Sequence, residues 1–435
     1  MPKPSCSERL ITFRIAGLLL GMSATAATLA IGQTPGNDST RSVSSTENSA
    51  ANAESWLNWM GNDHDGISNE SGWSTTWPDN ELPVKWRREI GIGFSSVSIA
   101  AGRLFTMGHQ DGKETVYCLD TETGKTRWSH SYDSALVDNL YEGGPGSTPT
   151  IDGNNVFTVG KEGQLFCFDI DDGSVIWSRD LQDDLDVSLP EWGFNGSPLI
   201  HGDQLILEAG RVVSYDKSNG EINWQTDKHT AGYGSAVRFT PQGRDLIATL
   251  DSDAVRVIQA SDGREIDAFP WKSPFRTNST TPIAQEDTLF VSTGYQVGCG
   301  LFRLVDDRLE LIYDNKSMRN HFNNSILQDG YLYGFDGNSN FGRVVQLNCM
   351  NHATGEVAWK ERDLGCGSLM IADGKLVILS DDGRLVIAEA TPTAFRELCQ
   401  ASILSGRCWT VPVLLGGCVY ARNAAGDLVC VRLPR

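Results

Sequence analysis

Short runs in which apolar and polar residues alternate recur along most of the chain, and each run ends in a turn rich in Gly or Asp. Typical runs cover residues 104–107, 156–159 and 376–379. Alternation with a period of two predicts strands, and pairs such as Asp152-Gly153 suit hairpin turns that need a positive φ. Regularly spaced short strands without long helical periodicity predict an all-β fold.

The runs group into units of about 45 residues, the length typical of a four-stranded propeller blade. Each unit opens with a small or polar pair before its first strand. The eight openings are Ser95-Ser96, Gly146-Ser147, Gly196-Ser197, Gly234-Ser235, Thr280-Thr281, Asn324-Ser325, Gly367-Ser368 and Trp409-Thr410. We therefore predict an eight-bladed β-propeller over residues 82–435.

A second motif, Gly followed four residues later by Trp, recurs in four of the units. The pairs are Gly124 and Trp128, Gly173 and Trp177, Gly220 and Trp224, and Gly355 and Trp359. Trp is scarce, at 12 of 435 residues, so its recurrence at one offset marks a repeat. A ring of this size fills the widening gap between blades away from the axis, and we interpret each Trp as a wedge between neighbours. Two units deviate, because Phe269 and Tyr313 stand near the expected Trp positions.

The ring must close, because an open sheet edge invites aggregation. The last unit, from Trp409 to Leu433, has only three predicted strands. Residues 83–90, which include Trp86, have the pattern of a fourth strand with nothing before it. We predict that this segment completes the last blade.

The N-terminal residues have the pattern of an export signal. Lys3, Arg9 and Arg14 precede an apolar run over residues 15–31, so residues 1–32 are expected to be a cleaved signal peptide or an uncleaved membrane anchor. Residues 33–55 are rich in Ser, Thr, Asn and Gly and predict a flexible linker. Residues 56–81 form a leader segment of unassigned role. A periplasmic or secreted protein is expected.

Charge and cysteine content exclude some function classes. The formal net charge is −19, from 36 basic and 55 acidic residues, which argues against binding to nucleic acid. No two of the ten cysteines are adjacent or spaced as C-x-x-C, so there is no haem-attachment or paired zinc signature. Most cysteines are expected to be buried apolar residues. A disulfide between Cys418 and Cys430 across the last hairpin is the alternative at those two positions.

The units 120–128 and 351–359 resemble the repeat of pyrroloquinoline-quinone-like (PQQ-like) propellers, a superfamily that includes quinoprotein alcohol dehydrogenases and the outer-membrane assembly protein BamB. The resemblance covers about residues 82–435, and it is greatest to secreted PQQ-binding-like propeller proteins, many of them from planctomycetes. Their leader is also similar to the segment Trp59-Met-Gly-Asn-Asp-His-Asp-Gly66. The resemblance implies the fold. The quinoprotein enzymes carry adjacent cysteines, a Glu/Asn pair on calcium and a catalytic Asp, none of which has a matching motif here.

Residues just before each opening are expected to converge on one mouth of the central channel. They are Phe94, Glu142, Trp192, Phe194, Tyr233, Asn278, His321 and Trp409. A mixed aromatic and polar ring is typical of a small-molecule or peptide site, and the alternative is that the aromatics simply plug the channel. His321 is the obvious titratable base among them, as a catalytic group or as a structural residue.

Two acidic segments contain carboxylates that could bind a cation. Residues 180–191 carry four Asp and one Glu, but a solvated loop is the simpler interpretation. Residues 62–66 fail the EF-hand template, because Gly61 and Gly72 fall where acidic ligands are needed. No metal site and no catalytic residue are predicted.

Two functions are consistent with these sequence features. The first is an exported, non-enzymatic, monomeric propeller that acts as a binding or scaffold module for a protein, peptide or glycan in the bacterial envelope. The alternative is a periplasmic oxidoreductase that binds PQQ and Ca²⁺ at the channel mouth. The lack of adjacent cysteines favours the first.

Overall fold

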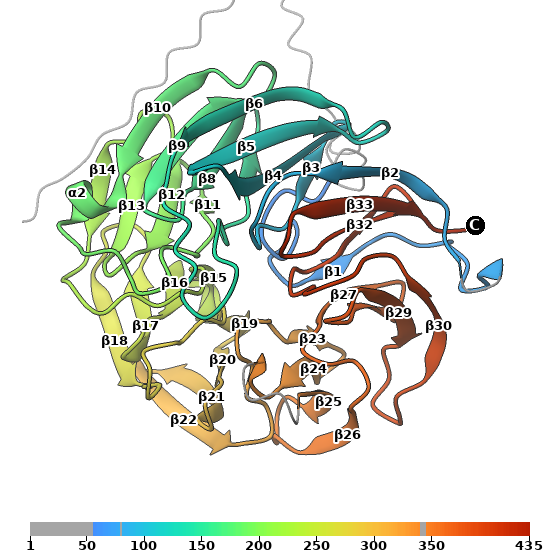
Figure 1. Ribbon diagram of the computed structural model, residues 1–435. Coiled ribbons are helices and arrows are strands. Elements are labelled where there is room, and N and C mark those ends of the chain that lie inside the picture. The colour runs from blue at the N-terminus through green and yellow to red at the C-terminus, as the bar shows by residue number, and fades with distance from the viewer. Residues whose placement is uncertain (1–54, 79–80, 340–344) are drawn as a thin grey trace, which may run out of the picture. The chain divides into compact units, whose positions relative to one another are not determined.

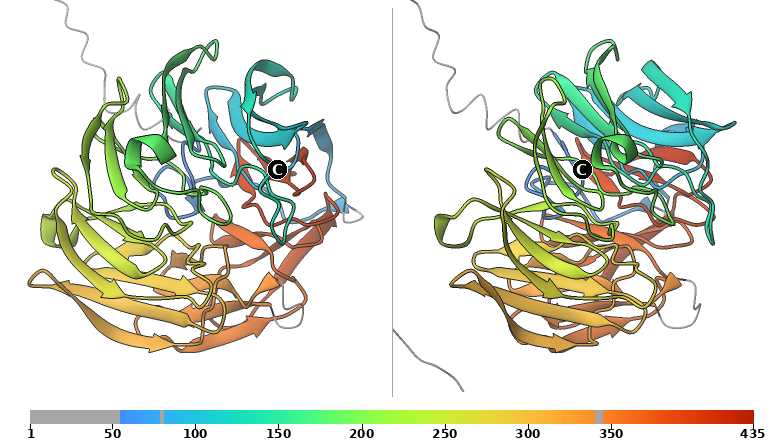
Figure 2. Two further views of the ribbon diagram at one scale, coloured as in Figure 1. Left: turned by 60° about the vertical axis from the view of Figure 1, so that its left-hand side comes forward. Right: turned by 90° about the vertical axis from the view of Figure 1, so that its left-hand side faces the viewer.

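The computed structural model describes residues 55–78, 81–339 and 345–435. They form eight sheets of four antiparallel strands arranged around a centre, one of them extended by a short parallel strand, and the chain colour runs round this ring from blue to red (Figure 1). Two further views show neighbouring blades side by side (Figure 2). The predicted eight-bladed, all-β propeller is confirmed.

The blades are numbered 1–8 along the chain. The strands of blades 1–4 are β3 (Ser98–Ala100), β4 (Arg103–Gln110), β5 (Lys113–Asp120) and β6 (Thr126–Asp133); β7 (Thr150–Asp152), β8 (Asn155–Val159), β9 (Gln164–Asp169) and β10 (Val175–Asp180); β11 (Leu199–His201), β12 (Gln204–Glu208), β13 (Val212–Asp216) and β14 (Ile222–Gln225); β15 (Val237–Phe239), β16 (Leu246–Leu250), β17 (Ala254–Gln259) and β18 (Glu265–Pro270). The strands of blades 5–8 are β19 (Ile283–Gln285), β20 (Thr288–Thr293), β21 (Gly298–Val305) and β22 (Arg308–Asn315); β23 (Ile326–Gln328), β24 (Tyr331–Asp336), β25 (Gln346–Asn351) and β26 (Val357–Glu361); β27 (Ser368–Ala372), β28 (Lys375–Leu379), β29 (Arg384–Glu389) and β30 (Glu397–Ser402); β31 (Val413–Leu415), β32 (Cys418–Arg422), β33 (Asp427–Arg432) and β2 (Val84–Glu89).

Blade 8 contains strands from both ends of the domain. β2 pairs antiparallel with β33, with Trp86 opposite Cys430, and the two strands lie side by side in Figure 1. This confirms the predicted closure. The buried guanidinium of Arg422 on β32 strengthens the junction with blade 1, because it donates to the carbonyls of Gly91, Ser95 and Met107.

The outer seams between blades are built from the repeated Trp and Gly. The Trp128 indole N–H donates to the carbonyl of Ile170 in the next blade, 3.1 Å away. A Cβ on Gly173 would lie 2.5 Å from the Trp128 ring, and Gly173 also has a positive φ, so only glycine fits there. A β-bulge just before Trp128, between Thr126 and Trp128, displaces the ladder by one residue and sets the direction of the side chain. The Trp is therefore a wedge between blades, as predicted.

The same seam recurs with other members. Trp86, Trp177, Trp224 and Trp359 each donate to a backbone carbonyl of the following blade. In blade 5 Tyr313 takes this place, because its hydroxyl donates to the carbonyl of His352 and its ring lies against Gly355. The unit that the sequence marks as degenerate thus keeps the seam with a different aromatic residue.

An inner set of hydrogen bonds gives a structural role to the polar side chains at the openings of units 2–6. The backbone N–H of one opening donates to the side chain of the next opening around the ring. The bonds form a chain in which each residue donates to the next: Ser96, Thr148, Ser197, Ser235, Thr281 and Asn324. The donor–acceptor distances are 2.9–3.2 Å. These side chains are buried and act as rungs between blades 1 and 6. We call this set the inner belt.

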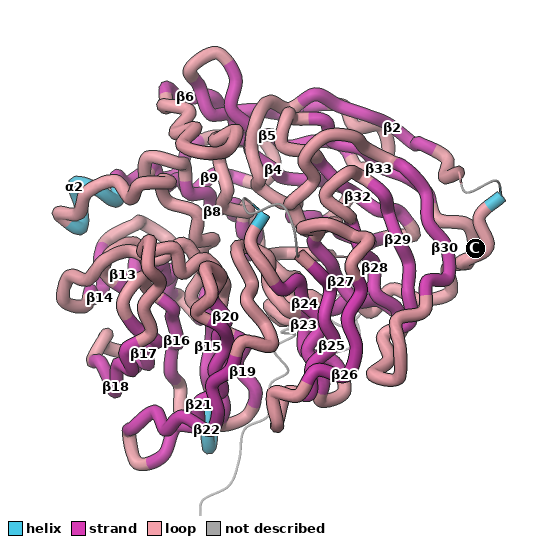
Figure 3. The backbone as a smooth tube through the Cα atoms, turned by 60° about the horizontal axis from the view of Figure 1, so that its bottom comes forward, coloured by secondary structure: helices cyan, strands magenta, loops and turns pink. Residues whose placement is uncertain are grey.

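The described residues contain little helix, as the tube view shows (Figure 3). The helical turns include α2 (Leu181–Leu185), which Asp180 caps, and η2 (Pro241–Gly243). No helix among the described residues is long and apolar enough to cross a membrane. The predicted signal or anchor and the linker up to residue 54 lie outside the described residues.

Nine cysteines are described, and all are buried and free. No disulfide joins Cys418 and Cys430 in this structure, and the first interpretation of both as buried apolar residues holds. The two residues lie on neighbouring strands β32 and β33, but they are diagonal rather than directly opposite, because Cys418 is paired with Arg432 and Cys430 with Tyr420. Their role is that of small core residues.

Candidate functional site

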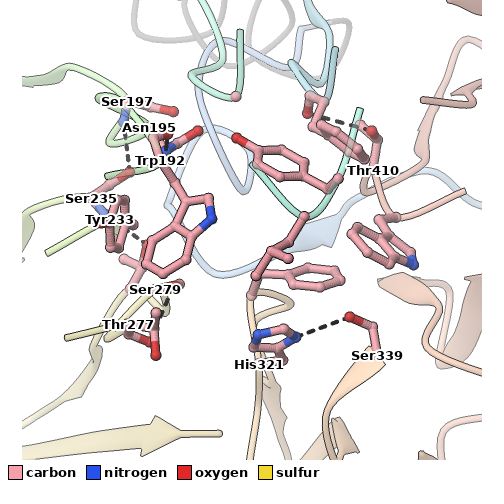
Figure 4. A pocket seen from close by; sticks show the side chains of 18 of the residues that line it. Trp192, Asn195, Ser197, Tyr233, Ser235, Thr277, Ser279, His321, Ser339 and Thr410 are labelled. Carbon is pink, nitrogen blue, oxygen red and sulfur yellow. Dashed lines mark hydrogen bonds between the residues drawn. The ribbon is translucent and has the colours of Figure 1, made fainter. Parts of the chain in front are cut away.

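A cavity of about 240 Å³ lies at the end of the channel where the first strands begin. Five of the eight predicted mouth residues line it, namely Phe94, Trp192, Tyr233, His321 and Trp409. Figure 4 shows Trp192 and Tyr233 on one wall, His321 below and Thr410 on the facing wall. The residues come from loops that precede different blades, so the ring assembles a site that no single blade contains.

Aromatic side chains form most of the cavity wall. Phe94 and Trp409 are stacked with ring centroids 5.7 Å apart, and Phe322 lies 4.4 Å from Trp409. On the other wall Trp192 meets Tyr233 edge to face at 5.8 Å. These contacts fix the rings in place, and all of these side chains keep part of their surface exposed to the cavity.

Three predicted mouth residues do not line the cavity. Phe194 is buried in the core between blades 2 and 3, and Asn278 is fully buried, donating to the carbonyls of Asp251 and Trp271. Glu142 sits behind the wall and accepts from Arg407 at 2.8 Å. The loops curve away from the channel axis at Phe194 and Asn278, which position in the chain alone does not reveal.

Sequence reasoning missed several cavity residues, among them Tyr141, Tyr295, Phe322 and Arg407. The Arg407 guanidinium lies 4.1 Å from the centre of the Trp409 ring, and it donates to the Glu142 carboxylate at 2.8 Å. Tyr141 and Phe322 directly adjoin the predicted residues 142 and 321. A window of two residues around each predicted position would have found them.

His321 is held as a neutral structural residue. Its Nδ1 is 3.1 Å from Ser339 Oγ and its Nε2 is 3.0 Å from the Tyr295 hydroxyl (Figure 4 shows the Ser339 contact). Burial lowers the pKa of His321 to about 4, so the imidazole carries no charge near neutral pH. No carboxylate among the described residues orients the imidazole, which makes it a poor general base.

The leader forms the floor of the cavity. Trp59 of the leader lines the cavity, and its indole N–H donates to Thr281 Oγ1 at 3.3 Å. The leader also contacts first strands near their far ends: Trp56 bridges to Ile99, Leu57 accepts from Ile151, and β1 (Ile67–Ser68) pairs in parallel with β27. Because these contacts lie beyond the openings, the leader fills the channel from the end opposite to the mouth.

The electrostatics of the cavity are close to neutral. Arg407 is the only charged side chain among the described residues that line it, and Glu142 balances it. Lys161 lies one layer behind, where its ammonium donates to Asn195 Oδ1 at 2.7 Å, and burial lowers its pKa to about 7. The neighbouring carboxylate of Glu114 accepts from the backbone N–H of Lys161.

The acidic segments have structural partners. In residues 180–191, Asp180 caps α2, Asp186 pairs with Lys228, and Asp184 accepts from Tyr215. In the leader, Asp65 accepts from the backbone of Ile67 and Asn62 from that of Leu57. Among the described residues no group of three or more His, Cys, Asp or Glu side chains is placed to hold a metal ion.

The residues that line the cavity do not fit pyrroloquinoline quinone with a divalent cation. The quinone is a planar tricarboxylate, and the described lining offers one cation that is already paired. The described cysteines are dispersed rather than adjacent, and no carboxylate among the described lining residues faces the cavity to ligate calcium.

Comparison with known proteins places this fold. A family model described as outer membrane protein assembly factor BamB matches residues 68–181 and 112–361. A search of curated proteins found no match. BamB from Moraxella catarrhalis is 14% identical with a TM-score of 0.57, covering 80% of this chain and 98% of its own.

Two other solved structures are similar to this chain. Quinohemoprotein alcohol dehydrogenase from Comamonas testosteroni is 11% identical with a TM-score of 0.67, covering 89% of this chain and 83% of its own. The computationally designed Ika8 protein is 12% identical with a TM-score of 0.57, covering 79% and 98%. At such identities the likeness is one of fold, shared by an assembly factor, an enzyme and a design.

Proposed function

Because the chain belongs to the family described as outer membrane protein assembly factor BamB, we propose that it is an exported binding module that holds its ligand in the cavity at the channel mouth. One observation carries the proposal: partly exposed aromatic rings from several blades meet around a cavity whose floor is closed by the leader. A structural plug would bury these rings against one another, whereas here they border open space.

The proposed module does not catalyse a reaction. The one imidazole among the described cavity residues is neutral and has no carboxylate partner, and the one guanidinium is paired. What the site offers is rigid ring faces with polar groups between them, and preorganised surfaces of this kind favour binding. Export rests on the apolar run at residues 15–31, which follows three basic residues.

The proposal is tested without knowing the ligand. A library of metabolites, peptides and oligosaccharides is screened for compounds that raise the melting temperature of the full-length protein. Any ligand of the mouth should lose this effect in the variant Trp192→Ala/Trp409→Ala. Ligands that stabilise the wild type and the double variant equally would place binding elsewhere and refute a site at the mouth.

A second candidate function is a PQQ-dependent oxidoreductase. The observation that favours it is the likeness in fold to quinohemoprotein alcohol dehydrogenase over 89% of this chain. The poor fit of the cavity residues to an anionic quinone and a cation counts against it. The protein is mixed with the quinone and Ca²⁺, and a shifted cofactor absorption with dye-linked alcohol oxidation would establish the enzyme. Neither change is expected.

A further inference from the structure

The charge of the cavity selects against ionic ligands. Among the described residues that line it, the guanidinium of Arg407 is balanced by Glu142, and His321 is neutral. A charged ligand entering this space would lose hydration without gaining a free counter-charge, and burying an unpaired charge is costly. An uncharged ligand does not meet this penalty.

The groups that remain available are ring faces and a few hydroxyl and amide groups. The indole N–H groups of Trp59 and Trp192 are already bonded, to Thr281 and to the carbonyl of Asn139, so these residues offer a ligand their rings. The hydroxyl of Tyr141 has no hydrogen-bond partner among the described residues. The exposed Asn139, whose side-chain nitrogen donates to Glu191, adds an amide group to the lining. A fitting ligand has flat C–H faces and polar groups at its edges.

A peptide backbone is a poor match for this cavity. Peptides are held chiefly by main-chain hydrogen bonds to unpaired backbone groups. At Ser197, Ser235 and Thr281, which line the cavity, the backbone N–H is already used by the inner belt. An extended peptide would therefore bury its amide groups without donors to satisfy them.

We propose that the ligand of this cavity is an uncharged carbohydrate whose sugar rings lie against Trp192 and the Trp59 floor. A pyranose ring presents C–H groups on its faces and hydroxyls around its edge, which matches ring faces bordered by Tyr141 and Asn139. This inference rests on the proposed binding function and adds the chemical class of the ligand. The leader is part of the site, because Trp59 supplies its floor.

The test is isothermal titration calorimetry on the full chain with four neutral oligosaccharides, built from glucose with α or β links, from xylose and from N-acetylglucosamine. At least one should bind. Its affinity should differ by less than about twofold between low and high salt, because a neutral ligand is not screened. Trp192→Ala and Trp59→Ala should each weaken it at least about tenfold.

The matched control is Leu311→Ala, which truncates a 39%-exposed apolar side chain on β22 outside the cavity. It should leave the affinity unchanged. The same titrations include choline, pyrroloquinoline quinone with Ca²⁺ and a tyrosine-containing tripeptide. If one of these binds through Trp192 and no sugar does, the carbohydrate inference is wrong and the binding function stands. If no probe shows Trp192-dependent binding, both are overturned.

Discussion

At the outer seams, Trp128, Trp177 and Trp224 make the same contact in successive blades, each donating to a carbonyl of the next blade. At the channel mouth, neighbouring blades present different residues, such as Trp192 beside Tyr233. The two regions belong to the same repeats. The seam is repetitive because every pair of blades meets the same packing problem. The mouth is varied because its residues meet around a single space.

The first prediction removes one seam wedge. Trp128→Ala deletes a ring that is 9% exposed and packs between Phe105 and Phe168, and it leaves the carbonyl of Ile170 without its donor. We expect a loss of about 3–5 kcal/mol in the free energy of unfolding, as for other buried Trp truncations. Urea denaturation measures it. A loss below about 1 kcal/mol would show that the seam is not a main source of stability.

The second prediction concerns the junction at which the ring closes. Arg422→Met nearly keeps the volume of the side chain but removes the buried donor to the carbonyls of Gly91, Ser95 and Met107, of which Ser95 keeps the Thr106 hydroxyl as a second donor. Leaving buried acceptors unsatisfied should cost about 2–4 kcal/mol of unfolding free energy. The control is Arg396→Met, which changes an exposed arginine of blade 7 and should stay within about 0.5 kcal/mol. Equal effects of the two variants would contradict the role of Arg422.

The third prediction makes the corresponding change at the mouth. Trp192→Ala removes a ring that is partly exposed and donates a hydrogen bond to the carbonyl of Asn139. We expect a smaller loss of unfolding free energy than for Trp128→Ala, because part of the Trp192 ring borders the cavity instead of packing between blades. The same urea series as for Trp128→Ala provides the comparison. A cost equal to that of Trp128→Ala would mean that the mouth rings are a structural plug.

This contrast explains what the sequence could and could not predict. The seam was predicted down to single residues, including Trp86 from the far end of the domain, because one packing solution is repeated and repetition is visible in a single sequence. The openings were also found, although their physical role as rungs of the inner belt became clear only from the bonds between Thr148, Ser197 and Ser235.

The mouth was predicted only in part, for a geometric reason. Position relative to an opening placed Phe94 and Trp409 correctly, but loop curvature decides whether a side chain faces the axis. It turns Phe194 and Asn278 into the core, and it brings Arg407, two residues before Trp409, to the cavity. The floor contributed by Trp59 depends on a segment outside the repeats threading the channel, which no local pattern encodes.

The fourth prediction uses a titrating group between blades 3 and 4. Burial and the charge of Arg256 lower the pKa of His229. The hydrogen bond to Glu208 and the negative charge of Asp251 outweigh them, so the pKa is raised above 6.5. Because the pKa is higher in the folded than in the unfolded protein, the stabilisation is complete below pH 6.5. It is lost as the pH rises through the pKa of the folded protein. Stability should therefore fall across that window.

The contribution of His229 is measured as the difference in unfolding free energy between wild type and His229→Gln at several pH values. Lys161 has its pKa lowered to about 7 by burial and so contributes with the opposite sign, but it is common to both proteins and cancels. If the difference between the two proteins does not shrink as the pH is raised above 6.5, His229 is not charged in the fold.

The last prediction places the smallest effect at the mouth. The pKa of His321 is lowered to about 4, so its folded form stays neutral where the unfolded imidazole, with its ordinary value of 6.5, takes up a proton. Its contribution is therefore present above pH 6.5 and is lost as the pH falls toward 4, the reverse of His229. In NMR of histidine-labelled protein, the His321 ring should not titrate between about pH 8 and pH 5, whereas His229 should remain protonated to above pH 6.5. The His321 signal is assigned as the one that is missing from the spectrum of the His321→Phe variant. A His321 signal that titrates near pH 6.5 would show that water and charge reach this wall of the cavity, and it would return the imidazole to consideration as a base.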